Sequence, residues 1–177
     1  DNAFSELVGP VEDLLDPDAC PGMTTTGCLE ARLAARIADG SFLILVELTG
    51  VESFAYDSAV DVTLHEVTVD GGGPPRLDGD GRLAPGQVFA AARTLGSATG
   101  DLFDGRLRVV FGARVELPAS AELLVPIELD GMELRAAVTA GELRLGVVGG
   151  TTEVEAIVAR AVAMDPGLEA TIRAVLH

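Results

Sequence analysis

Three kinds of side chain in this sequence could carry chemistry: a pair of cysteines, a cluster of aspartates and a lone internal histidine. Cys20 and Cys28 are separated by seven residues, which suits neither a C-x-x-C redox motif nor a usual zinc site. Because there is no leftover thiol, we expect a structural disulfide, which would close a short loop and add about 2–3 kcal/mol of stability. Such a disulfide indicates a protein outside the cytoplasm.

The aspartates lie in a glycine-rich stretch, residues 70–86. The sequence Asp-Gly-Asp-Gly at positions 78–81 is similar to the front half of a calcium-binding loop. An EF-hand also needs a third oxygen ligand two residues further on and an acidic residue at position twelve, where this chain has Arg82 and Phe89. Two interpretations follow: a glycine-rich turn with solvated carboxylates, or a calcium site built from Asp70, Asp78 and Asp80.

His65 lies on the polar face of a predicted strand, residues 59–69, where a histidine is usually solvated. Catalysis by His65 would need a carboxylate within hydrogen-bond reach inside a cleft. Glu47, beside an apolar run, is either a catalytic carboxylate or a strand-end glutamate that reaches solvent. The sequence contains no G-x-S-x-G elbow, HExxH motif, Walker loop or G-x-G-x-x-G turn after a strand. We therefore do not expect an enzyme, and no cofactor is implied apart from the calcium.

An arginine row follows from the alternation of residues 105–117, which predicts one long strand with a bend or bulge at Gly112. One face of this strand is apolar from Leu107 to Leu117. The other face carries the row, which consists of Arg106, Arg108 and Arg114. The row could bind a carboxylate or an anionic sugar. Alternatively, it pairs with charged residues of neighbouring strands, such as Glu133, Arg135, Glu142 and Arg144.

The composition excludes several classes of partner. The formal net charge is −16, with 28 acidic residues against 12 basic ones, and every basic residue is arginine. Such a surface repels phosphate backbones, so nucleic acid is not an expected partner. The longest apolar run, residues 42–46, is too short to span a bilayer, so no transmembrane segment is expected. The acidic and polar start does not resemble a signal peptide, so the protein is either cytosolic or a mature or trimmed form. The expected disulfide favours a mature form from which a signal sequence has been removed.

The C-terminal half gives the clearest strand pattern. Residues 123–148 alternate between apolar and polar, with Asp130-Gly131 and Ala140-Gly141 between the runs. Since Asp-Gly is a strong hairpin signal, this pattern predicts a three-stranded antiparallel meander whose apolar face includes Leu143 and Val147. The apolar run at 42–46 predicts a strand at the centre of the sheet, buried on both faces. Residues 87–95 could form a strand or a short helix.

Helical periodicity appears at both ends of the chain, in residues 4–15, 29–39 and 152–176, with Gly40 as a helix stop. We therefore predict an α+β fold: a mainly antiparallel sheet of about six to seven strands, with a meander in the C-terminal half, covered by short amphipathic helices from both termini. Residues 1–177 form one domain, with a helical N-terminal cover at 1–40, a sheet region at 41–148 and a helical hairpin at 151–177.

A family resemblance rests on several segments in order. These are Cys20 and Cys28, FLILVEL at 42–48, DVTL at 61–64, the Asp-Gly-Asp-Gly loop and GVVGG at 146–150. Over most of its length the chain resembles uncharacterised secreted proteins and lipoproteins of high-GC Gram-negative bacteria. The resemblance implies export to the periplasm, the cell surface or the medium, and no known activity.

These observations favour a non-enzymatic, extracytoplasmic module that binds another protein or assembles with copies of itself. The alternative is a carrier of a lipid or small apolar ligand, held in a cavity between the sheet and its helices. The carrier would have a continuous apolar cavity, and the module a solid core and a contact surface.

Overall fold

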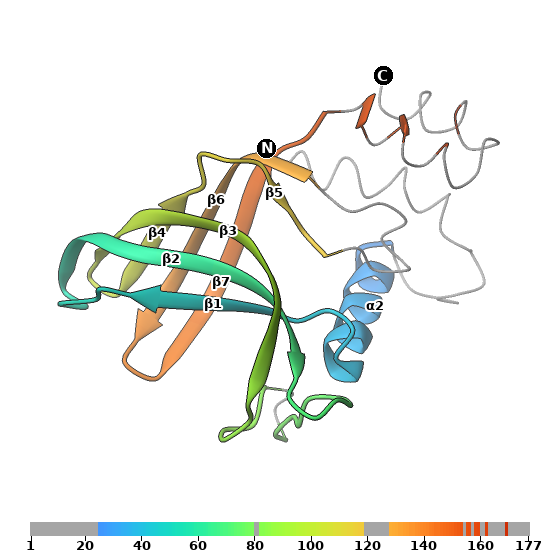
Figure 1. Ribbon diagram of the computed structural model, residues 1–177, viewed down its shortest axis with the longest axis horizontal. Coiled ribbons are helices and arrows are strands. Elements are labelled where there is room, and N and C mark those ends of the chain that lie inside the picture. Colours follow the sequence, from blue (N-terminus) through green and yellow to red (C-terminus); the bar gives the residue numbers. More distant parts are fainter. Residues whose placement is uncertain are drawn as a thin grey trace.

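The computed structural model describes residues 25–79, 82–118 and 128–153, and also residues 155, 156, 158, 159, 162 and 169. The described part is mainly an antiparallel β-sheet with one short helix (Figure 1). Its elements are α2 (Thr25–Asp39), β1 (Ile44–Thr49), β2 (Tyr56–Val69), β3 (Phe89–Phe103), β4 (Arg106–Val110), β5 (Val115–Glu116), β6 (Glu128–Thr139) and β7 (Glu142–Thr151).

The sheet is built from neighbours in the chain. β1, β2, β3 and β4 pair in sequence order, β6 pairs with β4, and β7 pairs with β6. β4 and β5 form one interrupted strand along β6: Val110 is opposite Glu133 and Val115 is opposite Leu129. The arginine-bearing strand thus has one more residue than β6 between these pairs, which confirms the bend expected at Gly112.

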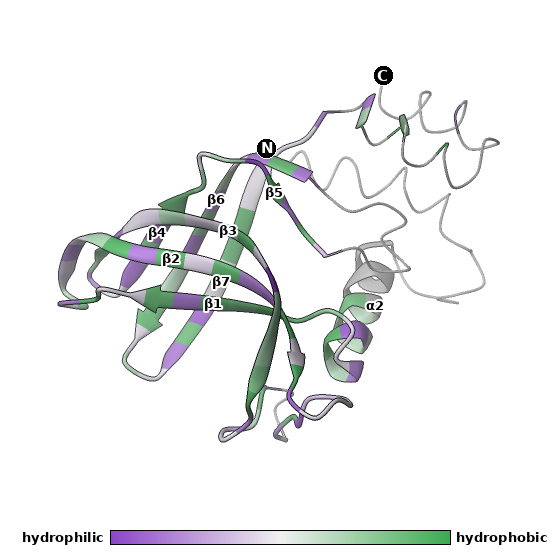
Figure 2. Ribbon diagram, viewed as in Figure 1, coloured by the Kyte–Doolittle hydropathy of each residue, from purple (hydrophilic) through white to green (hydrophobic). Residues whose placement is uncertain are grey.

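The core lies inside the curve of this sheet. Strand residues alternate between hydrophobic and hydrophilic (Figure 2), and the hydrophobic set faces inward. All members of the buried cluster come from the sheet region: Val60, Val62, Leu64, Leu95, Leu102, Leu107, Val109, Phe111, Val115, Met132, Leu134, Ala136 and Val138. The predicted inward face is therefore confirmed for Val60, Val62, Leu64, Leu107, Val109, Phe111 and Val115. Ala113, predicted on the apolar face, is exposed, and after the register shift at Glu66 the buried residue is Val67.

Two glycines of β3 allow the interior to pack closely. A Cβ atom on Gly100 would lie 2.7 Å from the carbonyl oxygen of Arg108 and 2.8 Å from Val109 Cβ. A Cβ atom on Gly96 would lie 3.0 Å from Val115 Cγ2. Residues of β4 and β5 already occupy the positions that side chains at Gly100 and Gly96 would need, so the packing beside β3 is tight there.

The hairpin predicted at Asp130-Gly131 is wrong. β6 continues through this dipeptide from Glu128 to Thr139 and bulges there, with a register shift against β7 and a φ of 57° at Gly131. The Asp-Gly turn occurs instead at Asp104-Gly105, between paired Phe103 and Arg106, with φ values of 48° and 69°. Two positive φ values in a two-residue loop are what a type I′ turn requires. Residues 119–127, which include most of the predicted first strand, lie outside the described residues.

Two further predictions about strands need correction. β1 does not lie at the centre of the sheet: it pairs with β2 alone among the described strands, and its side chains alternate between half-buried and exposed. In β7 the predicted apolar face is not buried, because Leu143 and Val147 are exposed. The turn at Ala140-Gly141 is confirmed, since Thr139 pairs with Glu142.

The helical predictions are only partly covered by the structure. α2 begins at Thr25, four residues before the predicted start, and ends before Gly40, whose φ is 81°. Residues 1–24 lie outside the described part. Residues 155, 156, 158, 159, 162 and 169 have helical backbone geometry, and Val158 is buried. No helix in the described part of the chain is long and apolar enough to cross a membrane.

Candidate binding surfaces

The cysteine and aspartate predictions fall partly on residues outside the described part. Cys20 is one of these, and Cys28 is in α2 with a side chain that is not described. Asp80 also lies outside, whereas the Asp78 carboxylate accepts a hydrogen bond of 2.9 Å from the Arg82 backbone and fixes a turn. Among the described residues no group of three potential ligands could hold a metal ion. Calcium binding and the disulfide stay predictions.

Arg108, the middle member of the arginine row, is bound by a carboxylate of the neighbouring strand β6. Arg108 Nε donates to Glu133 Oε1 at 2.5 Å, and Arg135 Nε donates to the same oxygen at 2.8 Å. Arg135 and Arg108 together lower the pKa of Glu133 from 4.5 to about 2, since both stabilise its charged form. For Arg106 the structure gives no ion pair within the described part of the chain.

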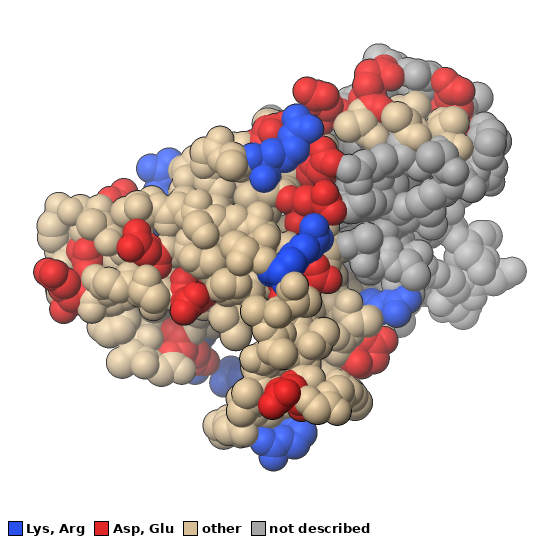
Figure 3. Space-filling model, viewed as in Figure 1, with Lys and Arg blue, Asp and Glu red and all other residues tan. Residues whose placement is uncertain are grey.

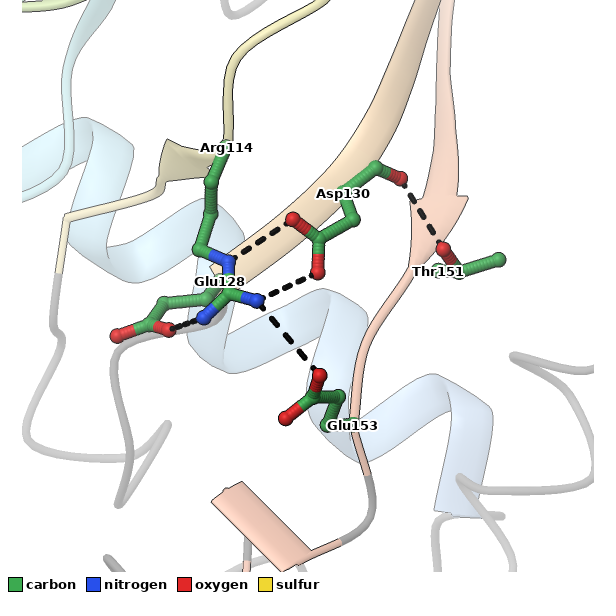
Figure 4. A network of polar contacts seen from close by, with 5 residues as sticks. All are labelled: Arg114, Glu128, Asp130, Thr151 and Glu153. Carbon is green, nitrogen blue, oxygen red and sulfur yellow. Dashed lines mark hydrogen bonds and ion pairs between the residues drawn. The ribbon is translucent and has the colours of Figure 1, made fainter.

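Arg114, the last member of the row, has a denser set of partners (Figure 4). Its Nε and Nη2 donate to the two carboxylate oxygens of Asp130 at 2.9 Å each, and its Nη1 donates to Glu128 at 3.0 Å. Glu153 lies 3.8 Å away, and Thr151 donates its hydroxyl to the Asp130 carbonyl oxygen at 3.2 Å. Arg114 lowers the pKa of Asp130, and this bidentate pair joins the residue before β5 to the bulge of β6. The Thr151 hydrogen bond joins the end of β7 to the same bulge.

The ion pairs change what the arginine row can do chemically. A guanidinium recognises an anionic ligand by directing its N–H groups at it, and here Arg108 and Arg114 direct theirs at carboxylates of β6. Figure 3 shows arginine side chains lying beside acidic ones on this face of the molecule. The anticipated cross-strand pairing is present for Glu133, which binds Arg108. Arg135 and Arg144 instead pair with glutamates of their own strands, Glu133 and Glu142.

His65 lies in a line of polar side chains on the outer face of the sheet. Its Nε2 is 3.0 Å from Glu47 Oε2 on β1, and its Nδ1 is 3.4 Å from Thr94 Oγ1 on β3. A carboxylate only accepts hydrogen bonds, so Nε2 carries the proton and, in the neutral ring, Nδ1 accepts from the Thr94 hydroxyl.

Other cross-strand polar pairs flank this line. The hydroxyls of Ser97 and Thr63 are 3.2 Å apart, and Thr99 donates to Asp61 at 3.2 Å. Glu47 therefore provides the carboxylate that catalysis by His65 would need. It belongs, however, to a regular ladder of polar side chains that hydrogen-bond with one another across the strands. The Glu47 side chain is half exposed to solvent, so we interpret the ladder as a solvated sheet face.

An aromatic surface lies at the end of the sheet opposite α2. We call it the aromatic end and define it as Phe54, Tyr56 and Phe103. Tyr56 pairs with Phe103 across β2 and β3, and their rings meet edge to face with centroids 6.3 Å apart. Both side chains are 65% exposed. The chain has only seven aromatic residues, six phenylalanines and one tyrosine, so three of them lie exposed at one place.

The Asp104-Gly105 turn holds the aromatic end in place. The backbone N–H of Gly105 donates to the Phe54 carbonyl oxygen and that of Asp104 donates to the Ala55 carbonyl oxygen, each at 2.8 Å. The turn of β3–β4 is thereby fixed to the connection before β2, and Phe103 is presented by a rigid hairpin.

Charged residues of both signs lie near the aromatic end, with carboxylates in the majority. The carboxylates are Glu52, Asp57, Asp101 and Asp104, and the arginines are Arg106, opposite Phe103, and Arg108, opposite Asp101. The backbone N–H groups of Glu52 and Ala59 lower the pKa of Asp57, which therefore stays charged. Figure 3 shows acidic side chains dispersed among uncharged ones at this end.

Sequence reasoning did not identify the aromatic end. Phe54 and Tyr56 stand together in the chain, but Phe103 is remote from them and belongs to a strand that the pattern left undefined. The available signal was Phe103 directly before Asp104-Gly105, which places an aromatic side chain beside a type I′ turn.

The chain matches no family model, and comparisons with curated proteins and with solved structures found no match.

Proposed function

We propose that this protein is a non-enzymatic binding module that docks a partner protein on its aromatic end. The observation that carries the proposal is the joint exposure of Phe54, Tyr56 and Phe103, beside a turn fixed by backbone hydrogen bonds. Aromatic side chains dominate the binding energy of protein interfaces because each buries a large area with little loss of conformational entropy. An aromatic pair that is already held in place before binding loses still less conformational entropy when a partner binds.

The charge around the aromatic end favours a basic partner. Four carboxylates, at positions 52, 57, 101 and 104, outnumber the two neighbouring arginines at positions 106 and 108, and the whole chain has a net charge of −16. Opposite charges at the rim of an interface speed association and exclude partners of the wrong sign. A partner with an apolar groove bordered by arginine or lysine fits this surface.

The carrier of a lipid or small apolar ligand is the second candidate. It would need free volume inside the sheet, whereas Gly96 and Gly100 are positions where a single added carbon meets neighbouring atoms. This packing favours the binding module over the carrier.

We also propose that helices from both termini cover part of the sheet, and that the module acts outside the cytoplasm. Burial of Val158 in a stretch with helical geometry supports a C-terminal cover. The extracytoplasmic location is supported by the expected disulfide between Cys20 and Cys28. Intact mass spectrometry with and without reductant tests the disulfide directly.

The docking proposal is tested by site-specific photocrosslinking of the full chain in the organism that makes it. A photoreactive phenylalanine analogue at Phe103 should give a discrete adduct with a second protein. The same analogue at Val88, an equally exposed apolar residue, serves as the control. Replacing Asp101 and Asp104 by asparagine should reduce the Phe103 adduct if the partner is basic.

Equal adducts at positions 103 and 88, or none at position 103, would contradict the docking proposal. An adduct with the mass of two copies of this chain would replace the heterologous partner by self-association through the aromatic end.

A further inference from the structure

Arg106 places a positive charge directly beside the aromatic end. Cross-strand pairing puts Tyr56 of β2 opposite Phe103 of β3, and Phe103 opposite Arg106 of β4. Residues opposite one another in an antiparallel sheet point to the same face, so the two rings and the guanidinium lie side by side across three strands. All three residues are exposed, whereas their neighbours along β3 and β4, Leu102 and Leu107, are buried on the other face.

The sheet supplies no counterion for this guanidinium. Arg106 lies between Phe103 on β3 and Ala137 on β6, so both of its cross-strand neighbours are uncharged. Arg108 and Arg114, in contrast, direct their N–H groups at carboxylates of β6. Within the described residues Arg106 makes no ion pair, so its N–H groups can bind a ligand. A guanidinium has five N–H donors and no acceptor, and a carboxylate can accept from two of these donors at once.

We propose that Arg106 binds an aspartate or glutamate side chain of the partner protein that docks on the aromatic end. This inference rests on the docking proposal and adds the residue that selects the partner. Arginine and tyrosine are among the residue types that contribute most to binding energy at protein interfaces, and both lie here on one face. The partner therefore carries an acidic residue next to its apolar contact surface.

The charges near the aromatic end change sign across the sheet. Glu52 and Asp57 lie before and at the start of β2, Asp101 and Asp104 lie on β3 and in its turn, and Arg106 begins β4. A matching partner is basic where it faces β2 and β3 and has one carboxylate where it faces β4. Since only one orientation of the partner satisfies both signs, Arg106 also fixes how the partner is bound.

The inference is tested by photocrosslinking of the full chain in the organism that makes it, with a photoreactive phenylalanine analogue in place of Tyr56. This position is two strands away from Arg106, so substitutions at Arg106 leave the probe in place. Arg106→Met should lower the yield of the adduct severalfold. Arg106→Lys should lower it less, because lysine keeps the charge and loses the bidentate geometry.

Arg76→Met is the matched control. Arg76 lies between β2 and β3, is exposed, and also makes no ion pair with any described residue, so its replacement removes the same charge from another place. The yield of the adduct should stay unchanged. An equal loss for Arg76→Met and Arg106→Met would reduce the effect to net charge and would overturn the Arg106 contact.

The sign of the effect separates this inference from the proposed function. A partner that is basic throughout is repelled by Arg106, so Arg106→Met would then raise the yield of the adduct. A raised or unchanged yield, with a normal adduct when Arg106 is present, would overturn the Arg106 contact and leave docking at the aromatic end intact. Absence of any adduct from a probe at Phe103 would overturn docking and this inference together.

Discussion

Two Asp-Gly dipeptides of this sheet have the same sequence and opposite structural roles. Asp104-Gly105 reverses the chain, with positive φ at both residues, and presents the exposed Phe103. Asp130-Gly131 lies within β6, with positive φ only at the glycine, and its carboxylate is bound by Arg114. The first dipeptide builds a surface with exposed aromatic groups, whereas the second is enclosed by partners from its own sheet. The partners available across the sheet therefore decide which role the dipeptide takes.

The largest loss of stability is expected from a substitution at Gly100, where β3 and β4 pair near the Asp104-Gly105 turn. Gly100→Ala places a carbon 2.7 Å from the Arg108 carbonyl oxygen, so it should lower the free energy of unfolding by about 1–3 kcal/mol. Gly112→Ala, where a Cβ atom meets nothing within 4 Å, should change it by less than about 0.5 kcal/mol. Denaturant unfolding measures both, and equal losses would show that the close approach at Gly100 is absent.

At Asp104, the positive φ should decide which substitutions the turn tolerates. Asp104→Val places a β-branched residue at a φ of 48° and should cost about 1–2 kcal/mol. Asp104→Gly should leave the stability unchanged or raise it, because glycine adopts this conformation without strain. If valine is tolerated as well as glycine, Asp104-Gly105 is not a type I′ turn in solution.

The Arg114–Asp130 ion pair at the second dipeptide should contribute modestly to stability. Arg114→Met removes the bidentate pair with Asp130, and because both side chains are well exposed the loss of stability should be small. Arg106→Met is the control, as the described structure gives Arg106 no ion pair, and it should cost less. A larger loss of stability for Arg106→Met than for Arg114→Met would contradict a stabilising role of the Arg114–Asp130 pair.

The smallest effect is a pH dependence centred on Glu133. Its pKa is lowered from 4.5 to about 2, so its contribution to stability is complete above about pH 4.5 and is lost as the pH falls toward 2. Unfolding midpoints of the original chain and of Glu133→Gln should therefore separate above pH 4.5 and converge toward pH 2. Curves that stay parallel over this range would show that Arg135 and Arg108 do not hold the carboxylate.

Local pattern predicted those parts of the molecule that local physics determines. The faces of residues 60–65 and 106–111 follow from period-two alternation, and the helix stop at Gly40 follows because glycine readily adopts a positive φ. Strand pairing is not determined by a few consecutive residues of the sequence. It decides the position of β1, the bulge at Asp130-Gly131 and the exposure of Val147. The aromatic end escaped prediction for the same reason, since Phe103 reaches Tyr56 only through the pairing of β2 with β3.

The central claim is that the aromatic end is exposed for contact and contributes little to folding. Denaturant unfolding of the double variant Tyr56→Ser and Phe103→Ser tests this claim most directly. The account predicts a loss of no more than about 1.5 kcal/mol, the value of one edge-to-face aromatic pair. A loss above about 3 kcal/mol, the size expected when a core phenylalanine is truncated, would show that these rings are part of the core and would contradict the account.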